Sequence, residues 1–260
     1  MDINHKENID MIKELNSSIY SNVKLKKMFF IPVEIKYAYE DIKNNDIFKD
    51  ILLFADMLKV KIIPIKKVRV AGLYSDKEIF INVKSGYPLF YVIGHEVSHM
   101  LEKRYVDYVY SMQKIIMKYI DDISDRNNKD NKSNINKNNK HKKINRYFKH
   151  LSKDYNFQYN RDDFNMLSLL FELVGDIIGE LWLQYDFWEL FKVGASEEMV
   201  KLADMGIKIA GEEKRIISEW NSVLDMFCDL DGFDRLSGLK CEVVEVFRRN
   251  LEECIGEVDG

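Results

Sequence analysis

The hydrophobic positions in the first half of the chain follow a helical spacing and then a strand-like spacing. Apolar residues share one face of a helix predicted over residues 46–58, for which Asp46 is a candidate N-cap. Three runs rich in β-branched and aromatic residues come next, at residues 60–65, 68–74 and 78–83. A turn is expected between the last two runs, so the pattern predicts a helix, a strand and then a β-hairpin. A further short strand is expected near residues 33–39.

Two long helices are predicted in the middle of the chain. Pro88 suits the first turn of a helix, and the apolar spacing after it predicts a helix that continues past Tyr110 to about residue 123. The second helix is expected over residues 164–191, with Asp162 or Asp163 as its N-cap. It is apolar almost all round, which predicts that it is buried.

The remaining pattern completes an α+β fold that is mostly helical, with a small β-sheet and a helical C-terminal region. Residues 197–256 predict two or three amphipathic helices, broken near Gly211 and again around residues 231–238. Together the elements indicate a mixed N-terminal extension, a central domain and a helical C-terminal region, at residues 1–45, 46–193 and 194–260. Residues 126–146 are rich in Lys and Asn and poor in apolar side chains, so we expect a mobile insertion there.

Composition and charge narrow the class of protein. The net charge is −4, so nucleic acid is not an expected partner of the whole molecule. The three cysteines are Cys228, Cys241 and Cys254; the number is odd and no two are close in sequence, which favours reduced, buried thiols over disulfides. Residues 1–16 carry no apolar segment typical of a signal peptide, and no stretch reaches about 18 uninterrupted apolar residues. We therefore expect a cytoplasmic protein without a membrane span.

The first chemical constellation is the segment His95-Glu96-Val97-Ser98-His99. On a helix, His95 and His99 lie one turn apart on one face and can bind the same metal ion. Glu96 is placed beside the metal, where a carboxylate can take a proton from a bound water and pass it to a leaving amine. The alternative is a chance pattern. The chain has only five histidines, and two of them with a Glu would be costly to bury in so apolar a helix without a purpose.

The second constellation lies on the buried helix expected over residues 164–191. Glu172, Asp176 and Glu180 follow one another at intervals of four, so they share one face. Glu172 as a zinc ligand and Asp176 as the hydrogen-bond partner of a ligand histidine would satisfy both buried acids. Gly175 and Gly179 would let this helix approach its neighbour closely. The alternative, that these acids pair with Lys or Arg or line a solvated edge, is the favoured interpretation for Glu180.

Residues 52–103 resemble the ImmA/IrrE type of bacterial zinc metallopeptidase. The similar segments are LKV at 58–60, AGLY at 71–74, IFIN at 79–82 and FYVIGHEVSH at 90–99. The segment ELVGD at 172–176 is similar to the downstream Glu-x-x-x-Asp pattern of zincins in general. The chain departs from the family in its long spacing between His99 and Glu172, in the sequence LWLQY at 181–185, and in having no evident helix-turn-helix.

The resemblance implies a zincin-like catalytic domain over residues 46–193, in which Zn²⁺ is bound by His95, His99 and Glu172. It also implies hydrolysis of peptide bonds in a protein substrate, for which regulatory proteins are candidates. A residue that stabilises the oxyanion is expected as well, and four residues remain open for that role: Tyr105, Tyr155, His150 and Arg161. The alternative function is a non-catalytic protein of zincin fold that binds a regulatory partner. An intact Glu96 argues against it, because a structural zinc site needs no base.

Overall fold

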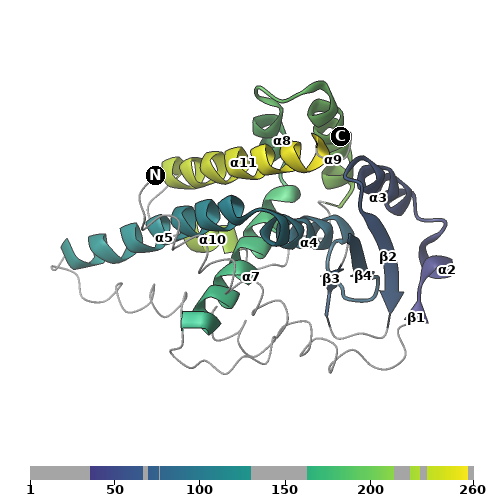
Figure 1. Ribbon diagram of the computed structural model, residues 1–260, viewed down its shortest axis with the longest axis horizontal. Helices are drawn as coiled ribbons and strands as arrows, with labels where there is room; N and C mark the ends of the chain where they lie inside the picture. Colours follow the sequence, from purple (N-terminus) through teal and green to yellow (C-terminus); the bar gives the residue numbers. More distant parts are fainter. Residues whose placement is uncertain are drawn as a thin grey trace.

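A computed structural model describes residues 36–66, 70–75, 77–129, 163–213, 223–228 and 233–256. The fold is α+β, mostly helical, with one small sheet at its side (Figure 1). The strands are β1 (Lys36–Tyr37), β2 (Lys61–Lys66), β3 (Gly72–Ser75) and β4 (Glu78–Asn82). The helices before the long gap are α2 (Tyr39–Ile42), α3 (Asp46–Met57), α4 (Leu89–Arg104) and α5 (Val106–Lys129). Those after it are α7 (Asp163–Trp182), α8 (Tyr185–Lys192), α9 (Glu197–Glu213), α10 (Val223–Cys228) and α11 (Phe233–Gly256).

The sheet has the strand order β1-β2-β4-β3. β3 and β4 are antiparallel neighbours, with Leu73 opposite Phe80, so the expected hairpin is confirmed over residues 72–82. β4 also pairs with β2 in parallel, while β1 pairs with the other side of β2 in antiparallel fashion. Among the strands that the structure describes, this order leaves β3 at the edge of the sheet.

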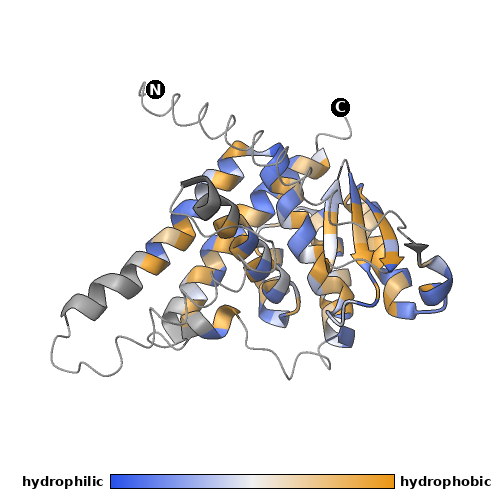
Figure 2. Cartoon of the chain, turned by 90° about the horizontal axis from the view of Figure 1, so that it is seen from below, coloured by the Kyte–Doolittle hydropathy of each residue, from blue (hydrophilic) through white to orange (hydrophobic). Residues whose placement is uncertain are grey.

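Helix α4 lies between the sheet and helices α5, α7 and α11 (Figure 1). It packs on β3 and β4 on one side and on α7 and α5 on the other. The sheet is largely hydrophobic, whereas the helices carry hydrophobic and hydrophilic residues in alternating stripes (Figure 2). One cluster of buried residues extends from Ile42 to Cys254, so the helices after residue 193 share this core.

An aromatic group at the centre of the core fixes α7 and α8 against α4. Trp182 and Trp188 are fully buried with ring centroids 4.8 Å apart, and Phe90 of α4 stacks on Trp188. Helix α7 lies so close to α4 that a Cβ added to Gly175 would come within 2.9 Å of the His95 ring. A Cβ on Gly179 would come equally close to Tyr91. These two glycines therefore permit the approach that the sequence suggested.

Several predicted boundaries were wrong. The N-cap of α3 is Asn45, whose side chain accepts a hydrogen bond from the Phe48 amide, while Asp46 is the first helical residue. The helix expected to run from Pro88 to about residue 123 is broken at Tyr105, which is in an extended conformation. Tyr105 carries no backbone signal in the sequence. The break lets the buried Tyr108 on α5 face the core, so tertiary packing determines it.

The helix expected over residues 164–191 is likewise two helices. α7 ends at Trp182 and α8 begins at Tyr185, with Gln184 extended between them. The Trp188 indole donates a hydrogen bond to the Trp182 carbonyl, which satisfies a backbone acceptor at the end of α7. The break allows Phe187, Trp188 and Phe191 to turn into the core, where all three are fully buried.

The remaining sequence predictions agree with the structure only in part. α5 extends to Lys129, so the first four residues of the predicted insertion at 126–146 are helical, and the rest lie outside the described residues. Gly238 lies inside α11 and marks no break. Cys254 is buried as expected, but Cys241 is exposed. Within the described part of the chain, no helix is long and apolar enough to cross a membrane.

Candidate metal centre

Helix α4 presents the two histidines of the HEVSH segment to the same point. His95 and His99 are one helical turn apart, and their Nε2 atoms lie 3.0 Å from each other. Both residues are 7% exposed, although the helix around them is otherwise apolar. Two imidazole nitrogens this close in a buried place require an explanation beyond packing.

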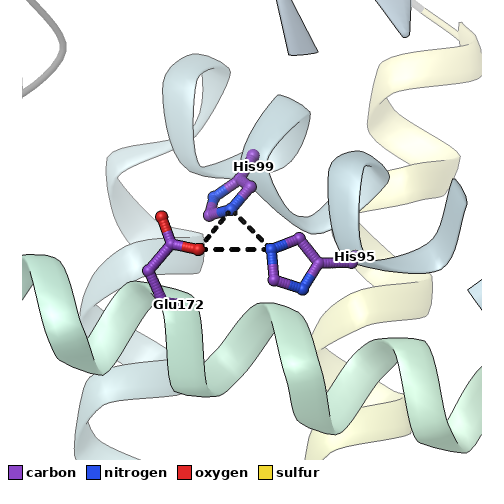
Figure 3. A group of neighbouring side chains, drawn as sticks. All are labelled: His95, His99 and Glu172. Carbon is purple, nitrogen blue, oxygen red and sulfur yellow. Dashed lines mark hydrogen bonds and ion pairs between the residues drawn. The ribbon is translucent and has the colours of Figure 1, made fainter. Parts of the chain in front are cut away.

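Glu172 comes to this point from α7 (Figure 3). Its Oε2 atom lies 3.3 Å from His95 Nε2 and 3.6 Å from His99 Nε2. The three residues are all buried, and in the described residues they form the one group of side chains arranged to hold a metal ion. The structure thus brings together the three ligands that the sequence suggested, although His99 and Glu172 are more than 70 residues apart in the chain.

The other nitrogen of each imidazole faces a carboxylate. His95 Nδ1 lies 3.0 Å from Asp176 Oδ1, and His99 Nδ1 lies 2.8 Å from Glu102 Oε2. An ionised carboxylate only accepts hydrogen bonds, so each Nδ1 carries the proton and donates. A neutral imidazole protonated at Nδ1 has its lone pair on Nε2. Both lone pairs therefore point to the same place as the Glu172 oxygen.

This donor set fits a metal dication. Two imidazole lone pairs and a carboxylate oxygen repel one another at 3.0 to 3.6 Å unless a positive charge lies among them. Ligand atoms bound tetrahedrally to one zinc ion lie about 3.3 Å apart, which matches these separations. The Oε2 atom of Glu96 is also buried, with no hydrogen-bond partner in the described residues. It is suited to accept a proton from a water in the same place.

The pKa values of both histidines are raised, which shows that their surroundings favour a positive charge at this place. Burial lowers the pKa of His95, but its hydrogen bonds to Asp176 and Glu172 outweigh this and hold the pKa well above the usual value. Burial also lowers the pKa of His99, yet the charges of Glu102 and Glu172 raise it to about 9. A proton satisfies this demand when it is on the imidazole, and a metal ion satisfies it when bound.

Glu96 lies against the edge strand of the sheet. A Cβ added to Gly72 of β3 would come within 2.6 Å of Glu96 Oε1 and within 2.5 Å of Val92. Only a glycine fits this close approach between strand and helix. The candidate base is therefore held beside the edge of the sheet.

The sequence predicted Asp176 beside a ligand histidine, but Glu102 and the hydroxyl groups around the two histidines were missed. Glu102 is 2% exposed, and its signal in the sequence is a Glu three residues after His99 on a strongly apolar helix. Tyr91 donates to Asp176 at 3.0 Å, and the side-chain oxygens of Ser98 and Tyr108 lie 3.0 Å apart. Burial and the nearby Glu102 charge raise the pKa of Tyr108 well above its usual value, so its hydroxyl remains protonated.

The structure does not bring every predicted residue to the centre. Glu180 is buried, but its carboxylate accepts hydrogen bonds from the amides of Val223 and Leu224 at the start of α10. The interpretation of Glu180 as lining a solvated edge was therefore wrong, while its pairing with a Lys or Arg stays a prediction. Tyr105 is buried directly after α4. The other three candidates for oxyanion stabilisation, Tyr155, His150 and Arg161, lie outside the described residues.

The chain was compared as a whole with known proteins. Comparison with models of protein families, with curated proteins and with solved structures finds no match. The centre itself is a buried His-His-Glu group that could hold a metal ion, with a second glutamate at its side.

Proposed function

We propose that this protein is a zinc-dependent metallopeptidase of the zincin type, which hydrolyses peptide bonds in a protein substrate. One observation carries the proposal. His95 and His99 from α4 and Glu172 from α7 direct three ligand atoms to one buried point, and the Glu96 carboxylate is buried next to them with an unused oxygen. A structural metal site has no need of that last group.

Zinc is the metal that this donor set favours. Two neutral imidazoles and one carboxylate, with a position left open, are the ligands of many catalytic zinc sites. When bound, zinc polarises a carbonyl group and lowers the pKa of a water molecule to near neutrality.

Glu96 would act as the general base and then as the general acid. Its carboxylate takes a proton from the attacking water and delivers it to the nitrogen of the leaving amine as the peptide bond breaks. Because Gly72 has no side chain, the carboxylate has room beside β3, where both transfers would take place. Such positioning matters because proton transfer requires the groups within hydrogen-bond reach.

The edge strand supplies a means to hold a peptide. Among the described strands, β3 pairs with β4 alone, and it packs on α4 beside Glu96. An extended peptide can add to such an edge through main-chain hydrogen bonds. A substrate strand along β3 would then pass in front of the base.

The proposed setting is the cytoplasm. Cys241 and Cys254 are free thiols in the structure, as is usual for proteins of reducing compartments. The substrate is proposed to be a protein of that compartment, and a regulatory protein is the kind that the family resemblance suggests.

The experiment combines metal analysis with a search for substrate. Purified wild-type protein should contain about one zinc per chain by mass spectrometry of its metals. Cells that carry wild type should show cleavage products that cells with Glu96→Gln lack, because loss of a general base slows hydrolysis by roughly 10²–10⁴-fold. Glu96→Gln should retain its zinc, since Glu96 is not a ligand.

Glu198→Gln is the matched control, because it makes the same change at an exposed position on α9. Cells with this variant should show the products of wild type. Wild-type protein that carries no zinc when zinc is available would refute the site. Zinc-loaded protein with identical cleavage products in wild type and Glu96→Gln would refute the peptidase.

A further inference from the structure

We propose that Glu102 is a positioning residue of the metal site, which holds the His99 ring in the orientation and tautomer that bind metal, and that Ser98 of α4 and Tyr108 of α5 anchor it. The inference rests on the proposed function in so far as His99 is a metal ligand. It assigns to Glu102 a role that neither the HEVSH segment nor the Glu-x-x-x-Asp pattern includes.

The first step is the placement of the Glu102 carboxylate. Its side chain is 1% exposed, and its Oε2 lies 2.8 Å from His99 Nδ1. Burying a carboxylate is costly unless it accepts hydrogen bonds. The Nδ1 proton of His99 supplies such a bond only when the lone pair of the ring is on Nε2.

The second step is what this bond does to His99. The Nε2 atom of His99 must face His95 Nε2 at 3.0 Å and Glu172 Oε2 at 3.6 Å to share a metal ion with them. An imidazole without a partner at Nδ1 can turn about its side-chain bonds and can carry its proton on either nitrogen. The Glu102 carboxylate removes both freedoms and makes Nε2 a stronger electron donor.

The third step is the support behind Glu102. The Ser98 hydroxyl lies 3.5 Å from Glu102 Oε1, and the Tyr108 hydroxyl lies 3.0 Å from Ser98. Because a carboxylate only accepts, Ser98 donates toward Glu102 and Tyr108 donates toward Ser98. Tyr108 is fully buried and its ring meets Phe247 of α11 edge-on. The position of α5 against α11 is thereby connected to the orientation of a metal ligand.

The arrangement mirrors the one on the other histidine. His95 is supported by Asp176, and Asp176 accepts a hydrogen bond from Tyr91. Each ligand imidazole thus has a carboxylate behind it, and a tyrosine hydroxyl belongs to each support. The two differ in origin: Asp176 comes from α7, whereas Glu102 comes from α4 itself, three residues after the histidine it holds.

The test measures zinc affinity by competition with a chromophoric chelator, together with circular dichroism to verify folding. Glu102→Ala should bind zinc roughly 10–100-fold more weakly than wild type. Glu102→Gln should show a smaller loss, because the amide oxygen can still accept the Nδ1 proton but carries no charge. Ser98→Ala and Tyr108→Phe should show losses smaller again. Asp107→Asn is the matched control, since it removes an acidic charge at an exposed position on α5, five residues after Glu102, and should leave the affinity unchanged.

A second readout separates positioning from general stability. Cobalt substituted for zinc has visible absorption bands that depend on the arrangement of its ligands, and these bands should change in Glu102→Gln and not in Asp107→Asn. If Glu102→Ala fails to fold, the isosteric Glu102→Gln decides: weaker binding with an intact fold supports the proposal, and unchanged affinity and bands overturn it. Failure of wild type to bind zinc would instead remove the proposed function itself.

Discussion

Two regions of the molecule use buried carboxylates in different ways. At the metal centre, Glu172 faces two imidazoles. At two helix N-termini, a carboxylate faces backbone amides: Glu180 accepts from Val223 and Leu224 of α10, and Glu213 accepts from the first two amides of α4. Glu172 and Glu180 lie on the same face of the same helix, two turns apart.

The difference lies in what each partner can give. Backbone amides at a helix start are fixed donors, and the helix dipole adds partial positive charge, so a carboxylate there is satisfied by the fold alone. At the metal centre the imidazole protons point outward to Asp176 and Glu102, so Glu172 meets lone pairs. A buried acid that faces donors receives its hydrogen bonds from the fold, and one that faces lone pairs requires a cation.

The largest expected effect separates the two acids of α7 by their zinc content. Glu172→Ala removes a ligand and should strip zinc nearly completely, whereas Glu180→Gln should leave zinc bound, since its partners are amides of α10. Asp176→Ala removes a hydrogen-bond partner of His95 but no metal ligand, so it should weaken zinc binding by roughly 10–100-fold. Metal analysis after dialysis against a weak chelator measures all three.

A different order would change the assignment. Full zinc occupancy in Glu172→Ala would require another third ligand. Loss of zinc in Glu180→Gln, with the fold intact by circular dichroism, would mean that the hydrogen bonds of Glu180 to α10 also support metal binding.

The sequence predicted the elements of the fold better than their ends. Periodicity located α3, β2, the β3–β4 hairpin and the start of α4, because each has local signals such as turn residues or Pro88. The breaks at Tyr105 and at residues 183–184 carry no Gly or Pro. They arise where buried aromatic side chains must turn toward a shared core, and such contacts are not local in the sequence.

The candidate centre could be predicted where helical spacing alone sets the geometry. Helical spacing placed His95 and His99 on one face of the helix that is now α4. It placed Glu172 and Asp176 on one face of α7. Spacing alone did not separate Glu180 from Glu172, because only tertiary structure shows which donors each acid meets. Glu102 was overlooked for the opposite reason: its position three residues after His99 is a local signal, but no motif included it.

The next largest effect is a dependence of stability on pH, which arises from the Glu213 carboxylate at the start of α4. Burial raises the pKa of Glu213 from 4.5 to about 7, although its bonds to the amides of Phe90 and Leu89 lower it. The folded state therefore holds the proton more tightly than the unfolded chain. The stability from this group is present below pH 4.5 and is lost as the pH rises through 7, by about 3 kcal/mol in total.

Glu213→Gln cannot titrate and should abolish this contribution. Urea unfolding at pH 5 and pH 8 should show that wild type loses about 2.5 kcal/mol more than Glu213→Gln between the two values. The metal centre titrates in both proteins, so the difference between them isolates Glu213. Equal losses in the two proteins would show that Glu213 shares one pKa in the folded and unfolded states.

The smallest effect tests the cap at α10 by itself. The Glu180 carboxylate accepts from two amides, and Glu180→Gln replaces one acceptor oxygen by an amide nitrogen that donates. One buried backbone N–H then loses its acceptor, which should cost about 1–2 kcal/mol in the free energy of unfolding. Glu189→Gln on α8 is the matched control, because Glu189 pairs only at the surface with Lys192 and should change stability by less than about 0.5 kcal/mol. Both are measured by urea unfolding at pH 8 with zinc bound, so that the metal centre is the same in each protein. If Glu180→Gln were as stable as Glu189→Gln, the bonds to α10 would contribute nothing, and the comparison between the two acids of α7 would rest on Glu172 alone.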